Sequence, residues 1–262
     1  MNLVARILDL DLDFFSWPII RGPVDGRPSD AEYRCATPEQ MRLFLESQCG
    51  LSRERKIMGH FCSTHDGAFD AWKQWIAEGT LEPGFAVDHV DAHSDLSFGD
   101  ASWYYILTEF LGLPLSKRSE PERRIHRLNE GSYLTFAIAN RWISSLSYVY
   151  PVPSNEAEND NADDTDDSYP SDLNRMLFRD QEFDLGLIEL QHLTCADADQ
   201  MMHGRLPSRP ISVEPAVPIR FVPGNRFSGS DYTHLILAHS EKYCPPSADE
   251  LIPVIQEYFV EA

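Results

Sequence analysis

Short runs of apolar residues alternate along this chain with stretches in which apolar positions recur three or four residues apart. An apolar run bounded by turn residues predicts a strand, and the recurring spacing predicts a helix. The sequence predicts strands at residues 3–12, 56–62, 85–90, 146–150, 184–190 and 234–238. It predicts helices at residues 37–49, 66–78, 103–111, 133–142 and from 247 onward. Strands that alternate with helices are typical of an α/β domain with a mostly parallel sheet.

Two of these helices begin with a capping signal. Thr37 is followed three residues later by Gln40, which is the pattern of a capping box, and Gly50 is expected to end that helix. Residues 247–250, with the sequence Ser-Ala-Asp-Glu, carry the same pattern and are expected to open the last helix. The segment 207–223 is punctuated by prolines, and we assign it neither a strand nor a helix.

The length of 262 residues and the hydrophobic fraction of 42% suit one domain with a sizeable core, and we interpret residues 1–262 as a single domain. Residues 154–172 interrupt it with eight acids and no base. Such a run lacks the apolar surface that packing requires. It is therefore expected to be a flexible surface insertion, because the alternation of strands and helices continues beyond it.

The charge of the chain limits its partners. Lysine and arginine total 22 against 42 aspartate and glutamate, which gives a formal net charge of −20. A field of this sign repels nucleic acids and anionic membranes, and it attracts metal ions and basic peptides. No run approaches the ~20 apolar residues of a membrane helix. The five scattered cysteines include no CxxC pair, which favours reduced thiols and a cytoplasmic location.

Three aspartates alternate with leucines near the start of the chain. Asp9, Asp11 and Asp13 share one face if this segment is a strand, because side chains on a strand repeat with a period of two. An edge strand with a solvated acidic face would show the same pattern. However, no base is interleaved to relieve the repulsion between the carboxylates, and a divalent cation bound by their oxygens would relieve it.

A second cluster lies just beyond the apolar run 85–87, which opens the strand predicted at 85–90. Asp91, His93 and Asp95 are spaced two residues apart and come directly after this predicted strand. In α/β sheets, ligands gather at the carboxyl ends of strands. A set of carboxylates and an imidazole suits Mn²⁺, Fe²⁺ or Zn²⁺ better than Mg²⁺ or Ca²⁺. Two such clusters, each at the end of a predicted strand, indicate a metal site.

The motif Asp91-Ala92-His93-Ser94-Asp95 resembles the DAHxD motif of the arginase, or ureohydrolase, superfamily, and Asp11-Leu12-Asp13 resembles its DxD motif. The resemblance implies an αβα sandwich of three layers with two Mn²⁺ ions at the strand ends. A further family ligand is a histidine between a strand and a helix. His65 stands in that context, whereas its competitor His60 lies inside a predicted strand and is expected to be packed.

The resemblance also implies how the ions are held. Asp91 and Asp11 would bridge them, His65 and Asp95 would complete one ion, and His93 and Asp13 would complete the other. Asp9 would be a supporting acid or a spare ligand, which leaves the register open by two residues. The implied metal ligands are Asp11, Asp13, His65, Asp91, His93 and Asp95, and Asp91 is also assigned a catalytic role.

The order of these motifs differs from that of arginases, in which the DxD strand comes late. The layout with DLDLDFF first, DAHSDL next and AHSEKYCPP late resembles the arginase-like family that contains the peptide arginases. Those enzymes convert arginine residues of a ribosomally made precursor peptide to ornithine and urea. The resemblance implies an arginine-containing precursor peptide as partner, and it covers most of the chain apart from the acidic run.

Two further site residues are candidates. Arginases use a histidine a dozen or so residues beyond DAHxD to protonate the leaving amine, but the next histidine here is His126. His239, at the end of the strand predicted at 234–238, is the substitute candidate. Glu241 is a candidate to pair with the guanidinium, as carboxylates do with arginine. Asn129 and Glu130 are expected to cap a helix instead of contacting substrate.

Three functions are consistent with these motifs. The first is hydrolysis of a guanidino group, on a peptide or on a free molecule of the arginine or agmatine type. The second is a deacetylase, which needs a single metal, and Asp13 and Asp95 argue against it because they supply ligands for a second ion. The third is a metal- or peptide-binding protein without catalysis. The sequence does not indicate an oligomeric state.

Overall fold

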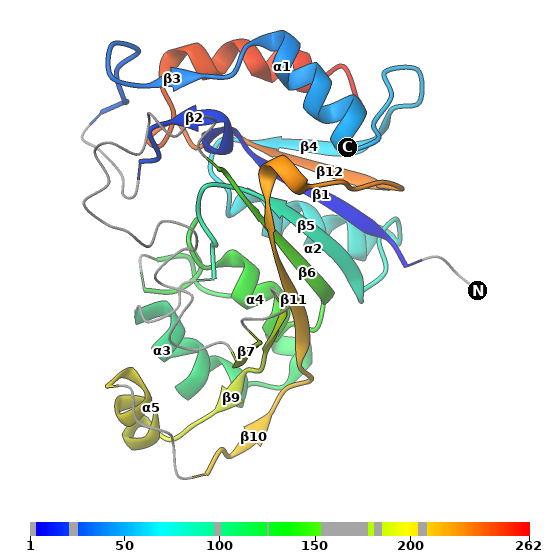
Figure 1. Ribbon diagram of the computed structural model, residues 1–262. Helices are drawn as coiled ribbons and strands as arrows, with labels where there is room; N and C mark the ends of the chain where they lie inside the picture. The colour runs from blue at the N-terminus through cyan, green and yellow to red at the C-terminus, as the bar shows by residue number, and fades with distance from the viewer. Residues whose placement is uncertain are drawn as a thin grey trace.

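A computed structural model shows an α/β fold (Figure 1). Its central element is a nine-stranded sheet with the strand order β13-β4-β12-β1-β5-β6-β11-β8-β7. From β13 to β11 all neighbouring strands are parallel, and β8 and β7 are antiparallel to their neighbours. The structure describes residues 4–20, 26–96, 101–124, 126–152, 178–180, 185–203 and 209–262.

The strands of the sheet alternate with helices along most of the chain. The strands are β1 (Arg6–Asp11), β4 (Ile57–Cys62), β5 (Phe85–Val90), β6 (Ile143–Tyr150), β7 (Phe178–Asp180), β8 (Leu185–Ile188), β11 (Val217–Pro223), β12 (His234–Ala238) and β13 (Phe259–Glu261). The α-helices are α1 (Pro38–Leu43), α2 (Gly67–Glu78), α3 (Ala101–Thr108), α4 (Tyr133–Ala139), α5 (Cys195–Met202) and α6 (Leu251–Ile255). Two small sheets pair β2 (Ser16–Trp17) with β3 (Arg34–Cys35) and β9 (Gln191–His192) with β10 (Ser212–Val213).

Helices cover both faces of the sheet, as Figure 1 shows. Successive residues of β1 point to opposite faces, so Ile7 packs in the core beneath α2, α3 and α4, and Leu8 packs in the core beneath α1 and α6. Trp72 and Trp75 of α2 are fully buried in the first core, and Leu251 of α6 is fully buried in the second. The predicted α/β class with a mostly parallel sheet is confirmed, and the layering is that of a sandwich of helices, sheet and helices.

The first capping box forms as predicted. The Thr37 side chain accepts a hydrogen bond from the backbone N–H of Gln40, and the Gln40 side chain accepts one from the N–H of Thr37. Helix α1 passes directly into a π-helical segment, η2 (Phe44–Gln48), which precedes Gly50. Helix α2 ends as predicted, because Gly79 adopts a left-handed conformation with φ of 74°.

The second capping box does not form. Residues 246–250 instead make a short 3₁₀ helix, η8 (Pro246–Glu250), and α6 begins only at Leu251 without a side-chain cap. The physical reason is that the backbone N–H of Ser247, which a capping box would pair with the Glu250 side chain, donates instead to Asp30 Oδ1 at 3.0 Å.

The proline-punctuated segment contains a strand that the sequence did not predict. β11 lies between β6 and β8, and its pairing with β6 runs from Ile219 to Pro223. Pro218 precedes this pairing and Pro223 ends it, so neither proline removes a hydrogen-bond donor from the middle of the parallel ladder. Strand β13, at the edge of the sheet next to β4, was also not predicted.

The acidic run at 154–172 lies outside the described residues, so its predicted flexibility stays a prediction. The strands before and after it, β6 and β7, belong to the same sheet. Within the described part of the chain, no helix has the length and apolar character that spanning a membrane requires. None of the five cysteines forms a disulfide, as their spacing predicted.

Candidate metal centre

Acidic and imidazole side chains converge at the carboxyl ends of four adjacent parallel strands, β4, β12, β1 and β5. β1 ends at Asp11 and turns at once into a 3₁₀ helix, η1 (Leu12–Phe15), which carries Asp13. His65 follows β4 and begins the turn into α2, and Asp91 directly follows β5. Because parallel strands end at one edge of the sheet, this topology brings distant parts of the sequence together.

The first group surrounds one nitrogen of His65. Nδ1 of this buried ring lies 2.9 Å from Asp91 Oδ2, and it lies 3.1 Å from Oδ2 of both Asp11 and Asp95. Nδ1 makes no hydrogen bond of good geometry with any of them. One nitrogen and three carboxylate oxygens directed at the same space are a donor set for a divalent cation.

The second group lies next to the first and shares Asp91 with it. His93 Nδ1 is 2.8 Å from Asp13 Oδ2 and 3.6 Å from Asp91 Oδ1. Asp91 therefore directs Oδ2 toward the first group and Oδ1 toward the second. The ligand atoms of Asp11, His65 and Asp91 lie within 4.8 Å of one another, and so do those of Asp13, Asp91 and His93. Each set could hold a metal ion; the first is fully buried, and in the second His93 is partly exposed.

Asp9 lies behind the first group and contacts two histidines. Its Oδ1 is 3.2 Å from His65 Nε2, and its Oδ2 is 3.0 Å from His89 Nδ1 and accepts a 2.5 Å hydrogen bond from the Tyr133 hydroxyl. Asp9, His65 and His89 also come close enough together to form a metal-binding set. However, both carboxylate oxygens of Asp9 already have partners, which favours a supporting role over that of a spare ligand.

Hydrogen bonds fix the remaining carboxylates. Asp11 Oδ1 accepts from the backbone N–H of Asp13 at 3.0 Å, and Asp11 Oδ2 accepts from the Ser240 hydroxyl at 2.5 Å. Asp91 Oδ1 accepts from the backbone N–H of His93 at 2.6 Å. On the far side of the His93 ring, Nε2 lies 2.8 Å from the carbonyl oxygen of Ile20. These contacts hold the carboxylates and rings in one arrangement.

The electrostatics of the site are those of crowded, buried acids. Burial, together with the charges of Asp11 and Asp91, raises the pKa of Asp13 well above its usual value. Burial and the charge of Asp91 raise the pKa of Asp95 to about 7. Burial also opposes ionisation of Asp91, but His89, His65 and His93 together lower its pKa well below normal. Such a cluster is costly without a cation among its members.

The chain adopts strained backbone conformations at two positions of the site. Asp95 has a φ of 49° and Ser240 a φ of 47°, values that residues other than glycine rarely adopt. Asp95 contributes an oxygen to the first group, and Ser240 binds Asp11. Strained backbone persists where the surroundings enforce it, and it is concentrated at functional sites. Because of the bend at Asp95, the segment 91–95 does not continue the strand as an extended chain.

The structure brings together all six ligands implied by the resemblance, but it places the other candidates elsewhere. The His239 ring lies with Nε2 2.7 Å from Asp249 Oδ1 and 3.2 Å from the Arg27 guanidinium. Glu241 is exposed in the turn after β12. His60 is not in the cluster, and its ring pairs with Glu261 at 2.7 Å. Asn129 and Glu130 do not cap α4 as predicted, because its N-cap residue is Ser132, and Asn129 Oδ1 accepts a hydrogen bond from the N–H of Gly131 in the turn before the helix.

Three residues of the site were missed by the sequence analysis. His89 lies inside β5 and precedes the motif at 91–95, but it is the direct cross-strand partner of Asp9, so the strand register could have identified it. Tyr133 and Ser240 are separated from their partners by 124 and 229 positions, and no pattern in the sequence indicates these contacts.

No protein-family model, no curated protein and no solved structure matches this chain. The possible metal site therefore rests on the geometry of the buried aspartates and histidines.

Proposed function

We propose that this protein is a manganese-dependent peptide arginase, which hydrolyses the guanidino group of arginine residues in a precursor peptide to give ornithine and urea. The observation that carries the proposal is the pair of adjacent carboxylate and imidazole groups that share Asp91. The resemblance of Asp11-Leu12-Asp13 and of residues 91–95 to the arginase motifs supports the choice of reaction.

The donor set fits two Mn²⁺ ions, because it combines several carboxylate oxygens with one imidazole nitrogen for each ion. Asp11 and Asp91 would bridge the ions. When bound, such a pair of ions lowers the pKa of a water molecule held between them, so that hydroxide is available near neutral pH. His65 and Asp95 would complete one ion, and Asp13 and His93 would complete the other.

The protein also has to bind the guanidinium of the substrate. A carboxylate pairs with a guanidinium through two parallel hydrogen bonds. Glu241 remains one candidate for this role. Glu130 is a second candidate, because its Oε1 accepts a 3.4 Å hydrogen bond from the Tyr243 hydroxyl and the Tyr243 ring lies edge-on to His93, with 5.0 Å between ring centroids.

The leaving amine needs a proton. His239 stays the candidate donor, but it holds its Nε2 toward Asp249 and Arg27 in this structure, so a change of side-chain orientation would precede proton transfer. The Tyr243 ring lies beside His93 and its hydroxyl donates to Glu130, so this hydroxyl is a second candidate for the proton donor.

The test is mass spectrometry of an arginine-containing peptide incubated with the Mn²⁺-loaded protein. A loss of about 42 Da per arginine, with one urea released, is expected for ureohydrolysis by two-metal hydroxide attack. The same peptide with lysine in place of arginine, and the protein treated with a chelator, should show no loss. Unchanged mass in the presence of two bound ions would contradict the proposal.

The alternative functions give different products in the same assay. A single-metal deacetylase would release acetate from an acetyl-lysine peptide and bind one ion. A ureohydrolase of small molecules would release urea from free arginine or agmatine and leave the peptide intact. A binding protein would retain metal or peptide without any product. The net charge of −20 favours a basic peptide over a neutral partner, and the proposed location is the cytoplasm.

A further inference from the structure

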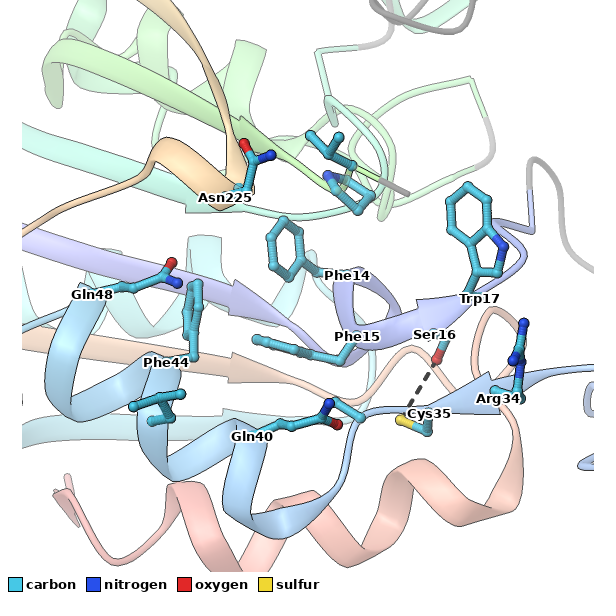
Figure 2. A pocket seen from close by; sticks show the side chains of 15 residues that line it. Phe14, Phe15, Ser16, Trp17, Arg34, Cys35, Gln40, Phe44, Gln48 and Asn225 are labelled. Atoms are coloured by element: carbon cyan, nitrogen blue, oxygen red, sulfur yellow. Dashed lines mark hydrogen bonds between the residues drawn. The ribbon is translucent and has the colours of Figure 1, made fainter. Parts of the chain in front are cut away.

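A pocket opens beside the proposed metal centre and shares no residue with it. The pocket has a volume of about 520 Å³ and is bounded by η1, the β2–β3 pair, α1, η2 and the short helix η7 (Gly224–Arg226). Figure 2 shows Phe14, Phe15 and Phe44 along its length, with Trp17 and Arg34 together on one side of the view. This volume is in the range of sites that bind small molecules or large side chains.

The walls of the pocket are aromatic. The rings of Phe14 and Phe44 lie 5.7 Å apart between centroids, and Phe15 meets Phe44 edge-on at 5.2 Å. Phe14, Phe15 and Trp17 are only half-buried, so their faces and edges are available to an occupant. Aromatic walls of this kind favour another ring, which can add stacked or edge-to-face contacts.

The charge of the pocket differs from that of the whole protein. Among the residues that the structure describes, Arg34 is the one charged residue that lines the pocket and no acid does so, although the chain has 42 acids against 22 bases. The pocket therefore does not favour a basic side chain. A neutral aromatic group is compatible both with the apolar walls of the pocket and with its charge.

Consecutive residues of η1 belong to the metal centre and to the pocket. Phe14 follows Asp13 directly in η1, and Asp13 Oδ2 lies 2.8 Å from His93 Nδ1. Consecutive Cα atoms are about 3.8 Å apart, so the two sites are one residue apart along the protein chain. An extended peptide advances about 3.3–3.6 Å per residue, so a residue one or two positions from an arginine at the metal centre is within range of the Phe14 wall.

One wall of the pocket depends on a glycine. A Cβ atom on Gly224 would lie 2.6 Å from Cζ of Phe14 and 3.2 Å from the carbonyl oxygen of Tyr150. The absence of a side chain at this position allows the Phe14 ring to pack against the backbone of η7. A methyl group there would therefore displace the Phe14 ring from its present position.

We propose that this pocket binds the side chain of an aromatic residue located within two positions of the target arginine in the peptide substrate. This inference rests on the proposed function, since it assigns the pocket to the substrate of the same site. It makes the enzyme selective for the sequence around the arginine as well as for the arginine itself.

The test uses a series of peptides with one arginine each. Phenylalanine, serine or lysine is placed in turn at each of the four positions within two residues of the arginine, and kcat/KM for ornithine formation is measured with the Mn²⁺-loaded protein. At one position or more, phenylalanine should exceed serine by about tenfold, which is the scale of selection by an apolar pocket, and lysine should fall below serine. If no peptide is converted, the proposed function fails and the inference fails with it. If all are converted equally, only the pocket assignment fails.

Two variants test whether the preference for phenylalanine over serine depends on this pocket. Trp17→Ala removes a wall, and Gly224→Ala displaces Phe14, so each should reduce the ratio of kcat/KM for phenylalanine and serine peptides toward one. Val213→Ala, which alters an exposed apolar residue in β10, should retain the parental ratio. Because both peptides are measured on one preparation, the ratio does not depend on the fraction of folded protein. A tenfold ratio that survives both pocket variants would overturn the assignment.

Discussion

Asp9 and His89 are direct partners on the neighbouring strands β1 and β5, and Asp9 Oδ2 lies 3.0 Å from His89 Nδ1. The other oxygen of Asp9 lies 3.2 Å from His65 Nε2, so that one carboxylate contacts both rings. A carboxylate on the far nitrogen of a metal-binding histidine fixes the ring and increases the basicity of its other nitrogen. Asp9 therefore directs His65 Nδ1 toward the three carboxylates of the first group.

We expect Asp9→Asn to weaken metal binding by about 10–100-fold without changing the number of ions bound, as is typical when the partner of a ligand is removed. Tyr133→Phe should have a smaller effect, because Asp9 then keeps both histidines. Calorimetric titration with Mn²⁺ measures affinity and stoichiometry together. The loss of one ion per molecule in Asp9→Asn would show that Asp9 is itself a ligand.

Asp91→Asn should abolish turnover and metal retention, because it removes the charge of the carboxylate that the two groups share. The fold should remain largely intact, as monitored by circular dichroism. Metal content is measured by elemental analysis after gel filtration. Glu54→Gln, at an exposed acid, is the matched control and should change stability by no more than about 0.5 kcal/mol. Activity of Asp91→Asn within a few-fold of the parent would contradict a bridging role.

The two candidates for guanidinium recognition are separated by paired variants. If Glu130 binds the substrate, Glu130→Gln should raise KM for an arginine peptide and Glu241→Gln should not. The reverse result would assign the role to Glu241. Because neither residue belongs to the metal-binding groups, both variants should bind Mn²⁺ as the parent does. Equal, small effects of both changes would exclude both assignments.

A buried ion pair away from the site predicts how stability depends on pH. Glu214 accepts hydrogen bonds from Arg118 and Arg141, each at 2.8 Å. Burial opposes ionisation, but the two arginines lower the pKa of Glu214 overall. A lowered folded-state pKa gives stability above the unfolded value of about 4.3, and this stability is lost as the pH falls through the folded value.

Glu214→Gln should accordingly cost about 3 kcal/mol at neutral pH, as expected when one partner of a buried ion pair is removed. The difference between parent and variant should shrink as the pH falls from about 5 to 3. Urea unfolding of both proteins across this range is the measurement. A constant difference would show that the ionised carboxylate is not the source of the stabilisation.

Deleting the acidic residues 156–172 should lower kcat/KM for a basic peptide at low ionic strength and leave kcat almost unchanged. The eight acids in the run 154–172 act at long range on a cationic partner. Salt screens this attraction, with a Debye length of about 8 Å at physiological ionic strength, so parent and deletion should converge at high salt. Loss of kcat at every salt concentration would instead make the run part of the active site.

The strands and acidic clusters that could be predicted are those that local sequence patterns encode. The strands at 85–90 and 234–238 were predicted with their observed limits, because the apolar stretches 85–87 and 235–238 mark them and both strands are almost entirely buried. The two acidic clusters were expected to lie together because each stands at the carboxyl end of a predicted strand, and parallel strands end at one edge.

The failures follow from contacts that no local pattern encodes. β11 was missed because its prolines argue against a strand, and only the sheet shows that they flank its pairing with β6. The capping box at residue 247 was wrong because the N–H of Ser247 binds Asp30, 217 positions earlier. Tyr133 reaches Asp9 from a helix on one face of the sheet, and its helix is predictable whereas its hydrogen bond is not.

The position of β12 in the sheet determines when the metal centre can form during biosynthesis. β12 lies between β4 and β1, although residues 234–238 are synthesised long after both. Adjacent strands are about 4.8 Å apart, so β12 holds β4 and β1 two strand spacings apart. His65, which follows β4, and Asp11, which ends β1, have side chains 3.1 Å apart, and β12 sets the spacing of the strands that carry them. A growing chain that ends before residue 234 lacks this strand, so the arrangement of the two groups is completed only after β12 has been synthesised.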